Sequence, residues 1–338
     1  MAQRLKSAGR GDGERLTAGQ PALVRRAVKK SERPLVTVKD LAILLWLCVG
    51  AAAAPLPRAW RWQLCRYAAR LASRTRRGRD ARVRAVRIGK IPAADVERVI
   101  QELYAGRLAA HLDVMRALLL GPDVRVKCRG LAEIDAALAQ GHGVVLWISD
   151  FVSAGDVSKI ALARAGYRVT HLSRSEHGFT TSAFGIRYLN PLRIRFESAH
   201  LAERIVFDRT NPAPAMSQLI GRLRANGVVS IIASMHEGGT LADLPFLSGR
   251  LKIALGALRL ARVSGAAVIP VFVLRESAEA FETIFTAPLT IPHGSREAEA
   301  LLAPACEYRD RLEAFVRDRP ECWVGWRRAG QLAEAVPT

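Results

Sequence analysis

Two aspartates in the middle of the chain have types and positions suited to proton transfer. Asp150 and Asp156 lie in the segment 143–156, which reads GVVLWISDFVSAGD. The apolar run Val144–Ile148 predicts a buried strand that stops abruptly, and we expect a helix to follow it to about residue 165. In open α/β sheets, sites form at the carboxyl ends of strands, where the next helix begins. The corner after this strand is therefore the first place to expect acid–base chemistry.

Two further polar segments contain a histidine near an acidic residue. His236 and Glu237 follow a predicted strand at 228–233, in the glycine-containing stretch HEGGT, so they are candidates for catalysis and for substrate binding respectively. His171 and Glu176 are five positions apart, which places them on opposite faces of a strand, so only a turn between them could bring them together. The alternative for both segments is an ordinary polar loop.

Common catalytic and nucleotide-binding motifs are absent from the sequence. The stretch Gly141–Gly143 precedes a strand instead of following one, so it is not a dinucleotide-binding fingerprint, and neither GxSxG nor GxxxxGK[ST] occurs. The five cysteines are scattered and form no CxxC pair, which indicates reduced thiols in the cytosol and not a metal site. We therefore expect neither a metal ion nor a cofactor.

The elements that must position these groups alternate between strands and helices. Strands are predicted at 124–127, 144–148, 168–172, 205–207, 228–233 and 267–274, and helices at 92–120, 131–138, 214–225, 251–263 and 297–317. This alternation predicts an α/β fold with a mostly parallel central sheet and helices on both faces. An aromatic and basic tail is expected to follow the last helix.

The amino-terminal quarter differs from the rest in charge and hydropathy. Residues 1–90 contain 22 Lys/Arg against five Asp/Glu and so hold +17 of the net charge of +20. Leu41–Pro57 contains no charged residue, and as a helix it would reach about 25 Å, slightly short of a hydrocarbon core of about 30 Å. This stretch predicts an N-terminal hydrophobic membrane-anchor helix, either spanning or monotopic; a buried core helix is the alternative.

Residues 58–78 predict a basic amphipathic helix. Trp60, Leu64, Tyr67, Ala68 and Leu71 share one face of a helical wheel, and arginines at 66, 70, 74 and 77 lie beside it. This combination favours an anionic membrane surface as the partner. No base-reading motif follows, so we expect no nucleic-acid partner. The predicted organisation is a basic tail at 1–38, the anchor and amphipathic helix at 39–90, an α/β domain at 91–330 and a tail at 331–338.

Several segments, taken in order, resemble the bacterial lipid A late acyltransferase family, within the lysophospholipid acyltransferase superfamily. The resemblance covers roughly residues 40–330 and begins with the apolar anchor and the arginine-rich helix. The most specific match is at 315–328, FVRDRPECWVGWRR, which is similar to the family's Pro-Glu-x-Trp ending. The other matching stretches are RIVFDR at 204–209, PFLSGR at 245–250, ALRLA at 257–261 and AVIPVF at 267–272.

The resemblance implies O-acyl transfer at the cytoplasmic face of a bacterial inner membrane. The donor would be an acyl carrier protein or acyl-CoA thioester, and the acceptor a hydroxyl of a lysolipid or lipid A-type lipid. In this family a histidine at the end of the first core strand, in a His-x4-Asp/Glu motif, takes the proton of the acceptor hydroxyl. Arg174 and Arg209 would then be candidates to hold acceptor phosphates, through bidentate hydrogen bonds.

The motif is broken in this sequence. If Asp150-Phe151 aligns with the family's His-Phe, Gly155 takes the place of the acid; if Asp156 is the acid, Phe151 takes the place of the histidine. Three readings follow. The chain is an acyltransferase that uses another base (Asp150, Asp156, or a histidine such as His236 or His171), a pseudoenzyme that only binds lipid or acyl carrier protein, or an enzyme for a different transfer on the same scaffold.

Overall fold

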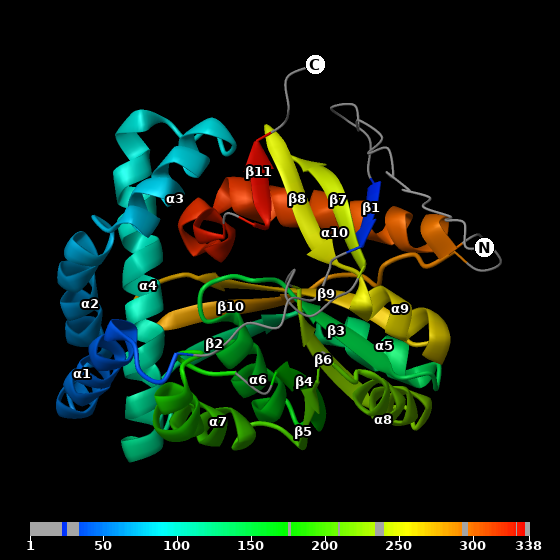
Figure 1. Cartoon of the computed structure of the whole chain (residues 1–338). Coiled ribbons are helices and arrows are strands. Elements are labelled where there is room, and N and C mark those ends of the chain that lie inside the picture. The colour runs from blue at the N-terminus through cyan, green and yellow to red at the C-terminus, as the bar shows by residue number, and fades with distance from the viewer. Residues whose placement is uncertain are drawn as a thin grey trace, which may run out of the picture.

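A computed structural model of the chain describes residues 34–174, 177–208, 210–233, 240–292, 297–328 and 330–334. It describes residues 22–25, 298 and 299 by their backbone alone. Figure 1 shows two sheets with helices around them and a group of amino-terminal helices along one side.

A seven-stranded sheet forms the centre of the molecule. Its order is β2-β10-β9-β3-β6-β4-β5. The strands are β2 (Arg125–Arg129), β3 (Val144–Ile148), β4 (Val169–Arg174), β5 (Glu203–Phe207), β6 (Val228–Ile232), β9 (Ala267–Arg275) and β10 (Ala280–Phe285). The five strands from β9 to β5 are parallel, whereas β10 runs antiparallel to β9 and β2 runs parallel to β10. The predicted mostly parallel sheet is confirmed.

Strand β3 lies in the middle of this sheet. It pairs with β9 on one side and β6 on the other, with Val144 opposite Ala267 and Val228, and all five of its residues are buried. A strand covered on both faces has no solvent-facing side, which is why its sequence is a continuous apolar run without alternation. This run made the bounds of β3 predictable to the residue.

Helices cover the sheet on both sides. They are α5 (Leu131–Ala139), α6 (Ala154–Arg164), α7 (Asn190–Ser198), α8 (Ala213–Arg224), α9 (Gly256–Ser264) and α10 (Glu297–Asp318). α8 and α9 pack against each other and against the strands. The chain moves in one direction along the sheet through α6 and α7 and returns through α8 and α9. Since parallel crossovers are right-handed, these two pairs cover opposite faces.

A second, antiparallel sheet was not predicted. It joins β1 (Ala22–Arg25), β7 (Thr240–Phe246), β8 (Gly249–Ala254) and β11 (Leu332–Glu334), and it stands beside α10 at the top of Figure 1. The helix predicted at 251–263 is therefore wrong at its start, because Leu251–Ala254 is strand and α9 begins at Gly256. Burial alternates along β8, and this period of two indicates a strand.

Four helices form the amino-terminal part of the described chain. α1 (Val38–Ala53), α2 (Arg58–Ala72) and α3 (Arg76–Arg87) pack against the long α4 (Ala93–Leu120), at the left of Figure 1. α1 begins with a capping box between Thr37 and Asp40, which satisfies its first N–H groups. In the part of the chain that the structure describes, no helix is both long and apolar enough to cross a membrane.

The predicted arginine-rich surface of α2 is only partly a surface. Arg58 and Arg61 are buried, and both pair with Asp113 of α4 and with Asp123. These ion pairs hold α2 against α4. The arginines at 66, 70, 74 and 77 are exposed, as the helical wheel predicts.

The segment after α10 is not a tail. Its two 3₁₀ turns, Pro320–Cys322 and Val324–Arg327, place Trp323 and Trp326 in the core. The two indole rings meet edge to face, with ring centroids 4.8 Å apart. The prediction of an aromatic and basic tail was wrong. Burial of these aromatic rings stabilises the folded segment by more than the loss of its backbone entropy destabilises it.

Candidate active site

The corner after β3 is fixed by the carboxyl-terminal part of the chain. The hydroxyls of Ser149 and Tyr308 lie 2.8 Å apart, and the ring of Tyr308 stacks on Trp147 with centroids 4.1 Å apart. Burial raises the pKa of the Tyr308 phenol, so this group stays protonated. The hydroxyl of Ser149, the first residue after the strand, is therefore held by a hydrogen bond inside the protein.

The Pro-Glu-x-Trp segment closes the corner from the other side. The backbone N–H of Val152 donates to the carbonyl of Cys322 (2.7 Å), and that of Val324 donates to the carbonyl of Asp150 (3.1 Å). The Asp150 carboxylate lies 2.5 Å from a guanidinium nitrogen of Arg328. The segment that carries the most specific family resemblance is thus in direct contact with the residue at the expected catalytic position.

Helix α6 starts directly after this corner. Ser153, which precedes it, adopts a left-handed conformation (φ 63°), and its buried Oγ has no hydrogen-bond partner among the described residues. Asp156, in the first turn, accepts a hydrogen bond of 2.7 Å from Arg193 of α7. Both aspartates at the corner are therefore paired with an arginine.

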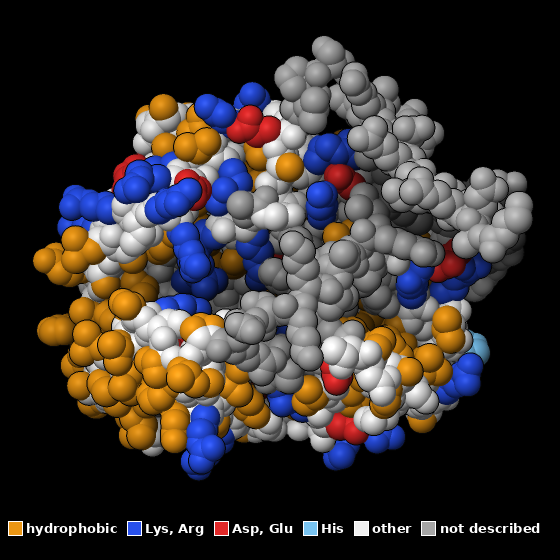
Figure 2. Space-filling model, in the orientation of Figure 1, with side chains coloured by type: hydrophobic (Ala, Val, Ile, Leu, Met, Phe, Trp, Pro, Cys, Tyr) orange, Lys and Arg blue, Asp and Glu red, His pale blue; other side chains and the backbone are white. Residues whose placement is uncertain are grey.

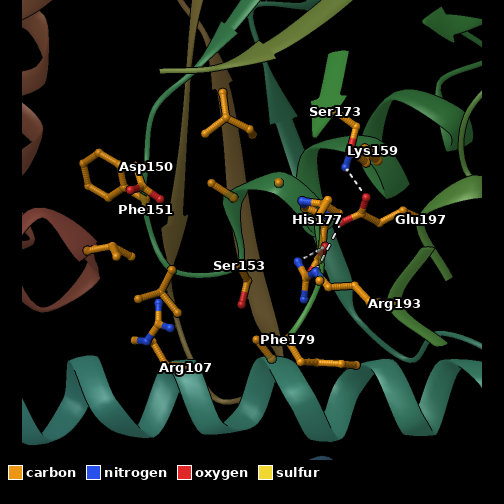
Figure 3. Close-up of a pocket in the computed structure, with 18 of the residues that line it drawn as sticks. Arg107, Asp150, Phe151, Ser153, Lys159, Ser173, His177, Phe179, Arg193 and Glu197 are labelled. Carbon is orange, nitrogen blue, oxygen red and sulfur yellow. Dashed lines mark hydrogen bonds and ion pairs between the residues drawn. The ribbon is translucent and has the colours of Figure 1, made fainter. Parts of the chain in front are cut away.

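A cavity of about 280 Å³ opens at this corner. Its wall is built from α1, α4, the 149–156 corner, β4, the 177–179 loop and α7. Figure 3 places Asp150 and Arg107 on one side, Ser153 in the middle, and His177, Arg193 and Glu197 on the other. The cavity thus lies at the carboxyl end of β3, where α/β proteins bind their ligands.

A buried charged cluster forms one wall of the cavity. Glu197, whose side chain is 1% exposed, has one carboxylate oxygen 2.6 Å from Nε2 of His177 and 3.3 Å from Nε of Arg193. Its other oxygen lies 3.1 Å from Nζ of Lys159, as an ion pair outside hydrogen-bond alignment. Burial alone would raise the pKa of Glu197, but the neighbouring Lys159 and the hydrogen bond from His177 hold it well below its ordinary value. Glu197 is therefore ionised at neutral pH.

Two other histidines line the cavity, of which His171 is buried and His111 is half-buried. His171 is 1% exposed and its Nδ1 lies 2.8 Å from the hydroxyl of Ser230. Burial holds the pKa of His171 well below its ordinary value. Burial, together with the nearby Arg107, lowers the pKa of His111 to about 3. Both imidazoles are neutral at pH 7.

A cation on α4 faces the same cavity. Arg107 makes no ion pair or hydrogen bond with any residue that the structure describes. Burial lowers its pKa to about 9, and the neighbouring Arg327 adds to this effect. A half-buried guanidinium without an ion pair is costly for the fold. The position of Arg107 suits a cavity whose ligand carries a negative charge.

The structure brings some of the predicted site residues together. Asp150, Asp156, His171 and Arg174 all line the cavity. The turn that would be needed to bring His171 and Glu176 together cannot be followed, because Glu176 lies outside the described residues. Arg209, His236 and Glu237 also lie outside them, so their catalytic and binding roles stay predictions.

Sequence reasoning missed the opposite wall of the cavity. His177, Lys159, Arg193 and Glu197 come from a loop and two helices, and no motif links them. One local signal was available, since Arg193 and Glu197 are four apart on one helix and so share a face. Nothing in the sequence placed His177 against that face.

Comparison with known proteins identifies the family of this chain. Residues 29–328 match the profile of the family described as bacterial lipid A biosynthesis acyltransferase, so the chain belongs to that family. The expected family resemblance is confirmed. A search of curated proteins finds no match.

One solved structure with a detectable similarity is the crystal structure of the 1-acyl-sn-glycerophosphate (LPA) acyltransferase PlsC from Thermotoga maritima. It is 10% identical, with a TM-score of 0.36, and the match covers 83% of this chain and 99% of that chain. A similarity this distant says nothing about substrate. Membership of the family supports the coarser conclusion, transfer of an acyl group to a lipid acceptor.

Proposed function

We propose that the protein transfers a fatty acyl chain from a thioester donor to a hydroxyl of a lipid acceptor, at the cytoplasmic face of a bacterial inner membrane. The observation that carries this proposal is the position of the cavity next to α1. Lys39 and Ile43 of α1 line the cavity, while Leu41, Leu44 and Leu45 of the same helix face outward. A lipid held against the outer face of α1 would have its polar end close to the cavity.

The outer faces of α1 and α2 form one apolar surface. Leu45 is 68% and Trp60 69% exposed, and Tyr67 and Leu71 extend the surface along α2. Figure 2 shows hydrophobic side chains gathered over these helices. Four exposed arginines in and between α2 and α3, at 66, 70, 74 and 77, lie near this surface. Large exposed apolar side chains beside arginines suit the interface of an anionic bilayer.

The charge around the cavity fits an anionic acceptor lipid. Arg107 has no carboxylate partner among the described residues and faces the cavity from α4. A phosphate or carboxylate group of the lipid would supply that partner. A lysophospholipid and a lipid A-type precursor both carry such a group, so the proposal covers both acceptors.

The test is acceptor-dependent release of free thiol. Purified protein in detergent is incubated with acyl-CoA or with acyl carrier protein thioester, in the presence and absence of lysophospholipids and lipid A precursors. We expect thiol release that requires an acceptor, with acylated lipid as the matching product. Comparing the two donors identifies the natural thioester. No acceptor-dependent release over the whole panel would overturn the proposal.

A pseudoenzyme is the second candidate, and one observation favours it. Asp150 and Asp156 lie at the corner where the family's motif is expected, but neither alignment supplies its histidine, and both aspartates are paired with arginines, Arg328 and Arg193. An arginine already occupies each carboxylate, so neither is free to approach an acceptor hydroxyl. If the protein binds acyl carrier protein or lipid without turnover in the same assay, this second reading replaces the first.

A further inference from the structure

An imidazole and a carboxylate form a hydrogen-bonded pair at the cavity wall. Nε2 of His177 lies 2.6 Å from Oε1 of Glu197, and the His177 side chain is 21% exposed and lines the cavity. Its other ring nitrogen, Nδ1, has no hydrogen-bond partner among the described residues and is not a buried atom. The ring therefore has one nitrogen fixed by an acid and one nitrogen open.

The loop that carries His177 is fastened to the helix that carries Glu197. Asn190, at the start of α7, accepts hydrogen bonds from the backbone N–H groups of Phe179 and Thr180 and donates to the carbonyl of Thr180. Gly178 has a φ of 147°, and a Cβ there would lie 2.2 Å from the Asn190 side chain. The glycine thus permits the close approach that sets His177 against Glu197.

The surrounding charges fix the protonation of the pair. Lys159 of α6 and Arg193 of α7 keep Glu197 ionised, and Asp156 balances Arg193. A carboxylate can only accept, so Nε2 of His177 must donate to it. The proton of the neutral ring is then on Nε2, which leaves the lone pair of Nδ1 free to accept a proton.

Burial lowers the pKa of His177, against the opposing effect of Glu197. The ring is therefore neutral at pH 7 and can accept a proton. When it does, the ionised Glu197 next to it stabilises the imidazolium. The pair thus has both properties of a general base: it is deprotonated before the reaction and its charged form is supported.

We propose that His177, oriented by Glu197, is the general base that replaces the missing motif histidine. This inference rests on the proposed function. As Nδ1 takes the proton of the acceptor hydroxyl, the oxygen bonds to the thioester carbonyl carbon. The tetrahedral intermediate then expels the thiolate by breaking the C–S bond, and the imidazolium returns the proton to sulfur. The products are an ester and a free thiol.

The other acid–base groups at the cavity are less suited to this step. Nδ1 of His171 is occupied by the hydroxyl of Ser230. Asp150 and Asp156 are held by arginines. His111 faces Arg107, whose positive charge opposes protonation of its ring. Among the described groups, only His177 combines an open nitrogen with an adjacent carboxylate.

The first test is kinetic. We expect His177→Gln to lower kcat about 10²- to 10⁴-fold with KM changed less than about threefold, the range for loss of a general base. His142→Gln is the matched control, because His142 is exposed and does not line the cavity; it should retain wild-type activity. Wild-type turnover that survives in His177→Gln would overturn the dyad and leave the proposed acyltransferase function standing.

The second variant separates a positioning role from a structural one. Glu197→Gln combined with Lys159→Met removes a buried charge pair together, so the fold keeps its charge balance. Glu197 raises the pKa of His177 and Lys159 lowers it by less, so the double variant should still move the acidic limb of the kcat/KM profile to lower pH, with kcat reduced about 10- to 100-fold. An unshifted acidic limb would overturn the role of Glu197.

The third measurement does not depend on activity. Nitrogen NMR of protein labelled in its histidines reports which ring nitrogen carries the proton. We expect a neutral His177 ring with the proton on Nε2 at pH 7, identified by the resonance lost in His177→Gln. A proton on Nδ1, or a charged ring, would overturn the dyad even if the protein is an acyltransferase. The expected tautomer in a protein without turnover would place the failure in the proposed function.

Discussion

The carboxylate of Asp150 lies 2.5 Å from a guanidinium nitrogen of Arg328, so the corner after the central strand is tied to the end of the chain. Most of both side chains is buried, at 15% and 27% exposure. Val324 and Cys322 add two backbone hydrogen bonds between the same segments. The segment after α10 therefore has a structural role at the corner after β3.

Removal of Arg328 should destabilise the fold. Arg328→Ala leaves the Asp150 carboxylate largely buried without its partner, so we expect a loss of about 2–4 kcal/mol in the free energy of unfolding. Urea unfolding measures it. Arg317→Ala is the control, because its pair with Glu313 is 59% exposed on the arginine side and should contribute less than about 1 kcal/mol. Equal losses in the two variants would show that the Asp150 pair contributes little.

Arg107 should lower the stability of the fold and strengthen the binding of an anionic ligand. Arg107 is half-buried at the cavity and makes no ion pair with a described residue, so Arg107→Leu is expected to raise the free energy of unfolding by about 1 kcal/mol. The same variant should bind an anionic lysolipid at least about tenfold more weakly, because it loses a charge-assisted hydrogen bond. Thermal unfolding and calorimetric titration measure the two effects. A variant that is less stable and binds the lipid normally would contradict this role.

The sequence was most informative where one residue pattern decides the structure. The continuous apolar run Val144–Ile148 is a strand buried on both faces, and its bounds are those predicted. The second sheet was missed because β8 alternates over only six residues and leads directly into α9, so the two together resemble one amphipathic helix. Trp323 and Trp326 are buried by contacts with distant segments, which no local pattern reports.

The candidate site was predictable on one side only. Asp150 and Asp156 follow a strand, and the topology of an α/β sheet alone places them at the site. His177 and Glu197 are twenty residues apart and meet because Asn190 fastens the 177–180 loop to α7. That contact depends on a side-chain clamp and a glycine with positive φ, which carry no periodic signal. The arginine partners of both aspartates were equally invisible to sequence reasoning.

The stability of the protein should fall on mild acidification. Burial lowers the pKa of His111 to about 3 and also lowers those of His171 and His177, so the folded state binds fewer protons than the unfolded chain below pH 6.5. Each histidine then contributes a loss of about 1.4 kcal/mol per pH unit as the pH falls from about 6.5 toward its folded pKa. Glu197 adds a similar loss only below its ordinary pKa of about 4.5.

Urea unfolding between pH 7.5 and pH 5 measures this slope. His111→Asn should reduce it by about 1 kcal/mol per pH unit, because the unfolded chain then has one proton fewer to bind. His142→Asn, which removes an exposed histidine, is the control. A slope that is the same in both variants would contradict the assignment to buried imidazoles.

The apolar surface of α1 and α2 should decide membrane binding. Leu45→Glu combined with Trp60→Glu places two charges on that surface at positions that are 68% and 69% exposed, so the fold should be unaffected. Insertion of these side chains into a bilayer would no longer be favourable, and we expect binding to anionic vesicles to fall at least about tenfold. Sedimentation with vesicles of anionic and neutral lipid measures it.

Val263→Glu, at an exposed apolar position on α9, is the control and should bind like the wild type. If high salt alone releases the wild-type protein, arginine contacts dominate instead of the apolar surface; unchanged binding of the double variant would rule that surface out as the docking site.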